Sequence, residues 1–193
     1  GQLHREHLQL LAENLYQKNT ELEKANERLR NVSLTDGLTG LNNRRGFMIL
    51  ATGLLKFARR AGYSLCLLYI DLDSLKYINN TFGHIAGDTA ITHFARILTE
   101  TFRDSDVIGR MGGDEFVILL IDATASDITG MQALLQSNVD AHNLQTGRDY
   151  ALSFSLGVIQ VNINSTETME TLLALADTEM YKHKRARKDK TGS

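Results

Sequence analysis

The chain has 193 residues, 42% of them hydrophobic, and a net charge of −2. This length suits one globular domain with some chain left over, and the charge gives no reason to expect nucleic acid or a membrane surface as a partner. The one cysteine, Cys66, excludes an intramolecular disulfide framework and favours a reducing compartment. No apolar stretch approaches the roughly 18 residues of a membrane span. We expect a cytoplasmic protein, and the helix-like start after Gly1 predicts a longer full-length chain with a sensor domain and room for a membrane anchor.

Residues 3–32 are predicted to form one long helix, because they contain no glycine or proline. Two apolar series run through this segment with a seven-residue repeat: Leu8, Leu15, Leu22 and Leu29, and then Leu11, Lys18, Ala25 and Val32. Such series form the seam of a coiled coil, interrupted here at Lys18. We therefore predict a signalling helix over residues 1–32 that joins two copies in a parallel homodimer. The alternative is a single amphipathic helix that lies on its own domain.

The composition changes at residues 33–47, where glycine and asparagine interrupt the helical pattern. Apolar periodicity further along the chain predicts helices at residues 44–61, 84–103, 126–142 and 168–187. It predicts strands at residues 64–73, 107–110, 116–121 and near 149–162, of which the second and third form a hairpin. Strands alternating with helices indicate an α/β sandwich, in which helices cover one sheet, and we assign it to residues 33–193.

Acidic residues gather where two of the predicted strands end or begin. Asp71 and Asp73 close the first strand, and Asp114 and Glu115 lie on the turn of the hairpin. If these strands are neighbours, the acids converge at one edge of the sheet, where like charges repel unless a cation lies between them. A small set of oxygen ligands favours Mg²⁺, and the preceding glycine pair leaves room for a bulky ligand. The alternative is a solvated acidic turn.

The chain resembles the GGDEF-domain diguanylate cyclase family in four ordered motifs. The signature that names the family stands in RMGGDEF, at residues 110–116. The other three are DGLTGLNNRR at 36–45, DLDSLKYINNTFGHIAGD at 71–88 and ALADTEMYKHKR at 174–185. The resemblance implies a fold similar to adenylyl cyclases and the polymerase palm, with a central, mainly antiparallel sheet. It spans residues 33 to about 188.

Members of this family condense two GTP molecules into cyclic di-GMP, a bacterial second messenger, and release two pyrophosphates. The resemblance implies that Mg²⁺, with Mn²⁺ as a substitute, is held by Asp71, the Leu72 carbonyl, Asp114 and Glu115. It makes Asp114 and Glu115 the catalytic residues, with Asp114 accepting the proton of the attacking 3′-hydroxyl. Asp73 is expected to support these ligands without binding the metal.

The resemblance also assigns residues to the nucleotide. Asn79 and Asp88 match positions that bind guanine, whose hydrogen-bonding edge is complementary to a carboxylate and an amide. The alternative is that Asn79 marks a helix end and Asp88 lies in the N-terminal cap region of a helix. Lys76, Lys184 and Lys188 match positions that contact phosphates. Lys188 stands where arginine is usual, so it would act as a point charge. The alternative for residues 182–190 is a solvated basic tail or a nucleic-acid patch.

Arg103 and Asp106 match the family's product-inhibition site upstream of the signature. Arginine can bridge guanine N7 and O6, and an aspartate can accept from the donors of the base. The alternative is a surface turn with a local ion pair, worth less than about 1 kcal/mol. The competing function is a catalytically inactive module that binds GTP or cyclic di-GMP as a receptor. The intact Asp71, Asp114 and Glu115 favour the enzyme.

Overall fold

The computed structural model describes residues 1–145, 147 and 149–191, and it describes the side chains in these ranges except at 2–4, 6, 30–32, 125 and 187–191. The chain divides into two compact units, Gly1–Leu34 and Thr35–Ser193. Each described helix is too short or too polar to span a lipid bilayer.

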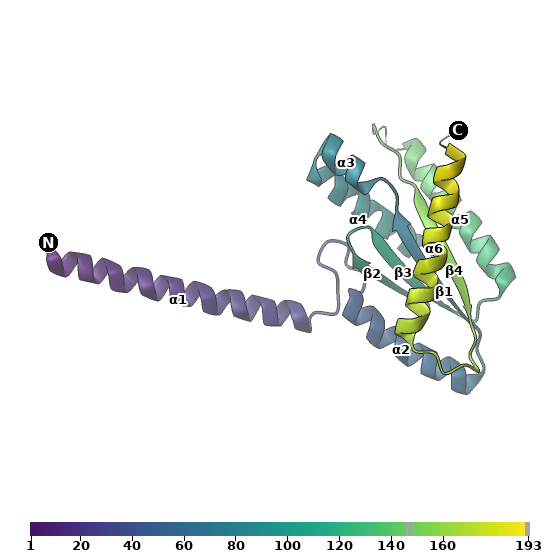
Figure 1. The fold of residues 1–193 in the computed structure, drawn as a ribbon, viewed down its shortest axis with the longest axis horizontal. Helices are drawn as coiled ribbons and strands as arrows, with labels where there is room; N and C mark the ends of the chain where they lie inside the picture. The colour runs from purple at the N-terminus through teal and green to yellow at the C-terminus, as the bar shows by residue number, and fades with distance from the viewer. Residues whose placement is uncertain (146, 148, 192–193) are drawn as a thin grey trace. The chain divides into compact units, whose positions relative to one another are not determined.

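The first unit is the helix α1, Gln2–Val32, which ends at Ser33 in an extended conformation (Figure 1). The predicted N-terminal helix is therefore confirmed. Its leucines find no apolar partner along a single helix, and Leu15 and Leu29 remain 69% and 68% exposed. This is the pattern of a coiled-coil seam, but the pairing of two such helices stays a prediction.

The second unit is built on one sheet of four antiparallel strands in the order β2-β3-β1-β4. Their bounds are β1 Leu65–Leu72, β2 Val107–Gly112, β3 Glu115–Ile121 and β4 Phe154–Val161. Every residue of β1 is buried, because this central strand has neighbours on both sides and helices over both faces. Its continuous apolar run follows from that position. The predicted α/β sandwich with an antiparallel sheet is confirmed.

Helices cover the two faces of the sheet in separate layers (Figure 1). One layer contains α3 Leu75–Phe82, α4 His84–Thr101 and α5 Ala125–Gln145. It packs on Leu68, Ile70 and Ile118, and the ring of Phe94 contacts Phe116. The other layer contains α2 Arg44–Ala61 and α6 Met169–Thr191. It packs on the alternate residues of the same strands, which include Leu67, Val117 and Leu119. The period-two alternation of strand side chains thus supplies both cores.

Two elements differ from the sequence-based expectation. The strand expected near residues 149–162 is shorter, because β4 begins only at Phe154. Before it, the Asn143 side chain donates to the Leu152 carbonyl and accepts from the Leu152 amide, both at 2.8 Å. A side chain thus takes the place of a neighbouring strand. For the helix α3 only a helix end at Asn79 was expected and no bounds were predicted, although Leu75, Ile78 and Phe82 have helical spacing.

Candidate active site

The predicted acidic residues meet at the end of β1 and the hairpin turn. Asp71 and Glu115 are directly opposite each other in the pairing of β1 with β3, so their side chains leave the same face of the sheet. Asp114 is bound to this edge by its backbone, because its carbonyl accepts from the Leu72 amide at 2.8 Å. The turn requires Gly112 and Gly113, whose φ angles of 151° and 43° disfavour other residues.

An arginine that was not singled out in the sequence fastens this turn to the opening loop of the domain. The Arg110 guanidinium donates to the Gly113 carbonyl at 2.8 and 3.1 Å, and to the two carboxylate oxygens of Asp36 at 3.0 and 3.2 Å. Burial would raise the pKa of Asp36, but the hydrogen bonds from Thr39 and Arg110 outweigh it and hold that pKa below its usual value. The clamp fixes the position of the acidic turn.

One ammonium group faces the acidic edge. Lys184 on α6 donates to Asp71 Oδ1 at 2.7 Å. Burial raises the pKa of Asp71, the hydrogen bond from Lys184 lowers it, and the charges of Asp114 and Asp73 raise it again, so that the pKa stays above its usual value. Burial opposes the positive charge on Lys184, but the surrounding carboxylates raise its pKa. Several carboxylates therefore share one cation.

The placement of Lys184 depends on close contact between α6 and β4. A side chain at Gly157 would overlap the backbone of α6 at Ala176 and Met180. Glycine at this position therefore lets the helix lie directly on the strand, which brings its next turns over the acidic edge.

Glu115 is surrounded by a second set of groups on the same face. It borders a cavity of about 500 Å³ that is also lined by Arg44, Tyr69 and Asp177. Burial raises the pKa of Glu115, the charges of Asp177, Asp114 and Asp71 raise it further, and a hydrogen bond from Tyr69 opposes the shift. Burial and the neighbouring acids likewise raise the pKa of the Tyr69 hydroxyl. Glu115 therefore carries its charge at a free-energy cost that a bound cation would relieve.

The donor set at this edge fits a hard divalent cation. Asp71, Asp114 and Glu115 offer only oxygen, and burial, reinforced by the charges of neighbouring acids, raises the pKa of Asp71 and of Glu115. The ammonium of Lys184 at Asp71 shows that the edge accepts a positive charge. Among the described residues, no three acidic, histidine or cysteine side chains form a ready-made metal cage. A small number of protein oxygen ligands suits Mg²⁺, because the remaining coordination positions are taken by water and by phosphate oxygens of the substrate.

The predicted base-binding residues lie on the other helical layer. Asn79 is in the last turn of α3, and Asp88 is exposed near the start of α4. A side chain at Gly87 would overlap Asn79 Oδ1, so glycine leaves the space in which the Asn79 amide lies. Asn79 therefore lies beside Gly87, the residue immediately before Asp88. Lys76 is exposed on the first turn of α3.

Lys188 lies in the last turns of α6, and its side chain is outside the described residues. Its predicted phosphate contact therefore stays a prediction. The neighbouring cation on the same helix, Lys184, is the one that reaches the acidic edge.

The predicted inhibitory pair lies at the start of β2. Arg103 is exposed, and both residues line a cavity of about 240 Å³. Asp106 is only 9% exposed, and its carboxylate accepts from the Arg103 amide at 2.9 Å and the Ile121 amide at 3.4 Å. Burial raises the pKa of Asp106, and these two amides oppose the shift. Asp106 thus organises the turn, while Arg103 is available to a ligand.

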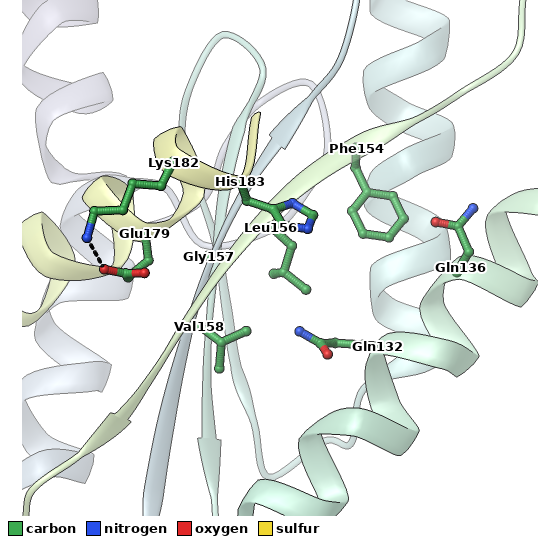
Figure 2. Close-up of a pocket in the computed structure, with 9 residues that line it drawn as sticks. All are labelled: Gln132, Gln136, Phe154, Leu156, Gly157, Val158, Glu179, Lys182 and His183. Carbon is green, nitrogen blue, oxygen red and sulfur yellow. Dashed lines mark hydrogen bonds and ion pairs between the residues drawn. The ribbon is translucent and has the colours of Figure 1, made fainter. Parts of the chain in front are cut away.

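A further hollow lies along β4. It measures about 780 Å³ and lies beside the edge strand β4, between α5 and α6 (Figure 2). Gln132 and Gln136 face it from α5 and His183 from α6, while Lys182 pairs with Glu179 at 2.7 Å. Among the residues whose side chains are described, none that was predicted for the active site lines this hollow.

Sequence reasoning missed four residues that shape the candidate site. They are Tyr69, Gly87, Arg110 and Asp177. Strand alternation could have found Tyr69, which stands two residues before Asp71 on the same face. The contact of Arg110 with Asp36 joins residues 74 positions apart, so no local pattern reveals it.

Comparison with known proteins shows the family of the chain. A family model described as "Diguanylate cyclase, GGDEF domain" matches residues 33–190. The probable diguanylate cyclase DgcC of Escherichia coli is 35% identical over 176 residues, which are 91% of this chain and 47% of DgcC. This chain therefore spans about half the length of that relative.

Solved structures show the same fold. The diguanylate cyclase SiaD of Pseudomonas aeruginosa, solved with its activator SiaC, has a TM-score of 0.73 and 29% identity, covering 96% of this chain and 70% of SiaD. The coiled coil and GGDEF domain of DgcB from Caulobacter crescentus, solved with c-di-GMP, has a TM-score of 0.73 and 26% identity, covering 91% of this chain and 95% of that one. On the family match over most of its length, the chain belongs to the family of GGDEF-domain diguanylate cyclases.

Proposed function

We propose that this chain is the catalytic part of a diguanylate cyclase, which condenses two GTP molecules into cyclic di-GMP and releases two pyrophosphates. Membership of the family supports this activity. The observation that carries it is the acidic edge, where Asp71 and Glu115 face each other beside Asp114 and the one ammonium, that of Lys184, pairs with Asp71. A purely structural turn has no need for this partly compensated negative charge.

In this proposal, Asp71, the Leu72 carbonyl, Asp114 and Glu115 hold Mg²⁺, or Mn²⁺ in its place. The bound ion would neutralise phosphate charge and favour ionisation of the attacking hydroxyl. Asp114 accepts the proton of that 3′-hydroxyl. Lys184, which contacts Asp71 without substrate, is close enough to the edge to pair with nucleotide phosphates instead. Lys76 and Lys188 contribute further positive charge.

Guanine is selected by Asn79 and Asp88 in this account. The base offers N–H donors to the Asp88 carboxylate, and the Asn79 amide supplies a donor and an acceptor. Adenine would leave these groups unpaired, which is the strongest form of rejection available to a polar site. The exposed position of Asp88 keeps it open to an incoming nucleotide.

The reaction requires two chains, because each holds one GTP and the product joins both. The exposed leucines of α1 provide a surface for a parallel homodimer, which raises the effective concentration of the two catalytic units. Cyclic di-GMP bound at Arg103, in the hollow that Asp106 organises, would inhibit the enzyme from outside the acidic edge.

Incubation with GTP and Mg²⁺, followed by chromatography and mass spectrometry, tests the proposal. We expect cyclic di-GMP and pyrophosphate in a ratio of one to two, with turnover per chain falling on dilution as dimers separate. ATP in place of GTP is the matched control. Tight binding of GTP or cyclic di-GMP without pyrophosphate release would instead identify an inactive receptor.

A further inference from the structure

Two histidines face each other between α4 and α5, and neither is among the residues proposed for the cyclase reaction. His93 Nδ1 and His142 Nε2 are 3.3 Å apart, although the residues are 49 positions apart in sequence. Their rings lie edge to face, with centroids 4.9 Å apart and an interplanar angle of 82°. His142 is 9% exposed and His93 is half-buried, so the pair lies at the border between the core and solvent.

The separation of these two nitrogens matches the span of a tetrahedral metal site. With Zn–N bonds of about 2.0–2.1 Å and a tetrahedral angle, two ligating nitrogens lie about 3.3–3.4 Å apart. The same distance accommodates a proton shared between the rings as an N–H···N hydrogen bond.

We propose that His93 and His142 form a binding site for a divalent transition-metal ion of the zinc class, which joins α4 to α5. Neutral imidazole is a preferred ligand of Zn²⁺, Cu²⁺ and Ni²⁺, whereas Mg²⁺ prefers oxygen. The pair therefore selects a different class of metal from the acidic edge at Asp71. No third histidine, cysteine or acidic ligand joins the pair within the described residues, so water completes the coordination shell.

The two helices hold the ligands in place before any metal arrives. Phe94, next to His93, is fully buried against the sheet, and Val139, one turn before His142, is fully buried as well. This packing limits the conformational freedom that metal binding would otherwise remove. Because the unfolded chain separates the two rings, the metal binds the folded state preferentially and stabilises it.

The test uses the metal-stripped 193-residue chain and titrates it with Zn²⁺ by calorimetry, in buffer with excess Mg²⁺ to occupy oxygen ligands. His93→Gln and His142→Gln each remove one ligating nitrogen. His84→Gln is the matched control, because it changes an exposed histidine on the same helix, α4. We expect the wild type and His84→Gln to bind one zinc per chain more tightly than either ligand variant, by at least about tenfold.

A second measurement separates binding from folding. Zn²⁺ should raise the thermal midpoint of the wild type and of His84→Gln but not that of His93→Gln. If His142→Gln does not fold, His93→Gln decides the outcome, because its side chain is half-exposed. Equal zinc affinity and an equal thermal shift in the wild type and His93→Gln would overturn the proposal, and the contact between the two rings would then be a hydrogen bond without a role in metal binding.

Discussion

An acidic side chain stands at each end of β2, and the two ends treat its charge in different ways: Asp106 at the start is buried, and Glu115 after the hairpin turn is partly buried. At the start of β2, the Asp106 carboxylate accepts hydrogen bonds from the amides of Arg103 and Ile121. At the end, partial burial raises the pKa of Glu115, and the charges of Asp177, Asp114 and Asp71 raise it further. Burial alone therefore does not mark a functional carboxylate. The distinguishing property is negative charge that the fold compensates only in part, because Lys184 pairs with Asp71 while the charges around Glu115 are further acids.

The largest expected effects come from replacing one carboxylate at each end of β2 and comparing the two variants. Asp114→Asn should lower the rate of pyrophosphate release from GTP by about 100-fold or more, because charge stabilisation in the transition state is lost. Asp106→Asn should retain most turnover and lower the free energy of unfolding by about 1–3 kcal/mol, since buried amides lose a charged acceptor. Circular dichroism checks that both variants are folded. Similar rates in the two variants would remove the distinction.

The space at Gly87 offers a smaller but sharper test of base selection. Gly87→Ala should push the Asn79 amide aside and weaken GTP affinity by about tenfold, with less effect on turnover at saturation. In an Asn79→Ala background, the same change should have little further effect, because no amide remains to be displaced. Calorimetry with a non-hydrolysable GTP analogue measures the cycle. Additive losses in the double variant would show that Gly87 acts independently of Asn79.

The clamp between Arg110 and Asp36 predicts a pH-dependent contribution to stability. The pKa of Asp36 in the folded chain is below its usual value of 3.8, so the pair stabilises the fold above that value and loses its effect as pH falls through the folded pKa. Asp36→Asn should therefore be less stable than the wild type by about 1–2 kcal/mol at pH 7 and nearly equal to it in strong acid. Urea unfolding at both pH values measures the difference. A difference in stability that persists in acid would mean that it does not come from the charge of Asp36.

The smallest expected effect concerns the ligand side of the Asp106 turn. Arg103→Ala should preserve initial turnover and weaken the binding of cyclic di-GMP by about two- to tenfold, because one charged donor is lost. Asp104→Ala, in the same turn, is the matched control and should bind as the wild type does. Calorimetry after removal of co-purified nucleotide makes the measurement. Unchanged affinity in Arg103→Ala would confine the turn to a structural role.

Local sequence patterns predicted the elements whose causes are local. The glycine-free heptads of α1, the apolar run of β1 and the hairpin around Gly112 and Gly113 each follow from neighbouring residues. The sequence was misleading at residues 149–153, where the Asn143 side chain replaces a strand partner. Such substitution of a side chain for a backbone partner has no signature in hydrophobic periodicity.

The candidate site divides in the same way. Motif resemblance named the acids at Asp71, Asp114 and Glu115, which the structure brings to one edge. It did not show that Arg110 reaches Asp36 or that Gly87 makes room for Asn79. These contacts depend on how loops and helices approach in three dimensions. They determine the geometry within which the named residues act.

Binding of Mn²⁺, followed by the loss of its free-ion paramagnetic resonance signal, tests the central claim most directly. The account places the ion at the partly compensated acids, so the wild type and Asp106→Asn should bind Mn²⁺ equally in the presence of a non-hydrolysable GTP analogue. Asp71→Asn and Asp114→Asn should each weaken that binding by at least about tenfold, because each removes an oxygen ligand. Equal Mn²⁺ binding by all four proteins would contradict the assignment of the acidic edge as the metal site.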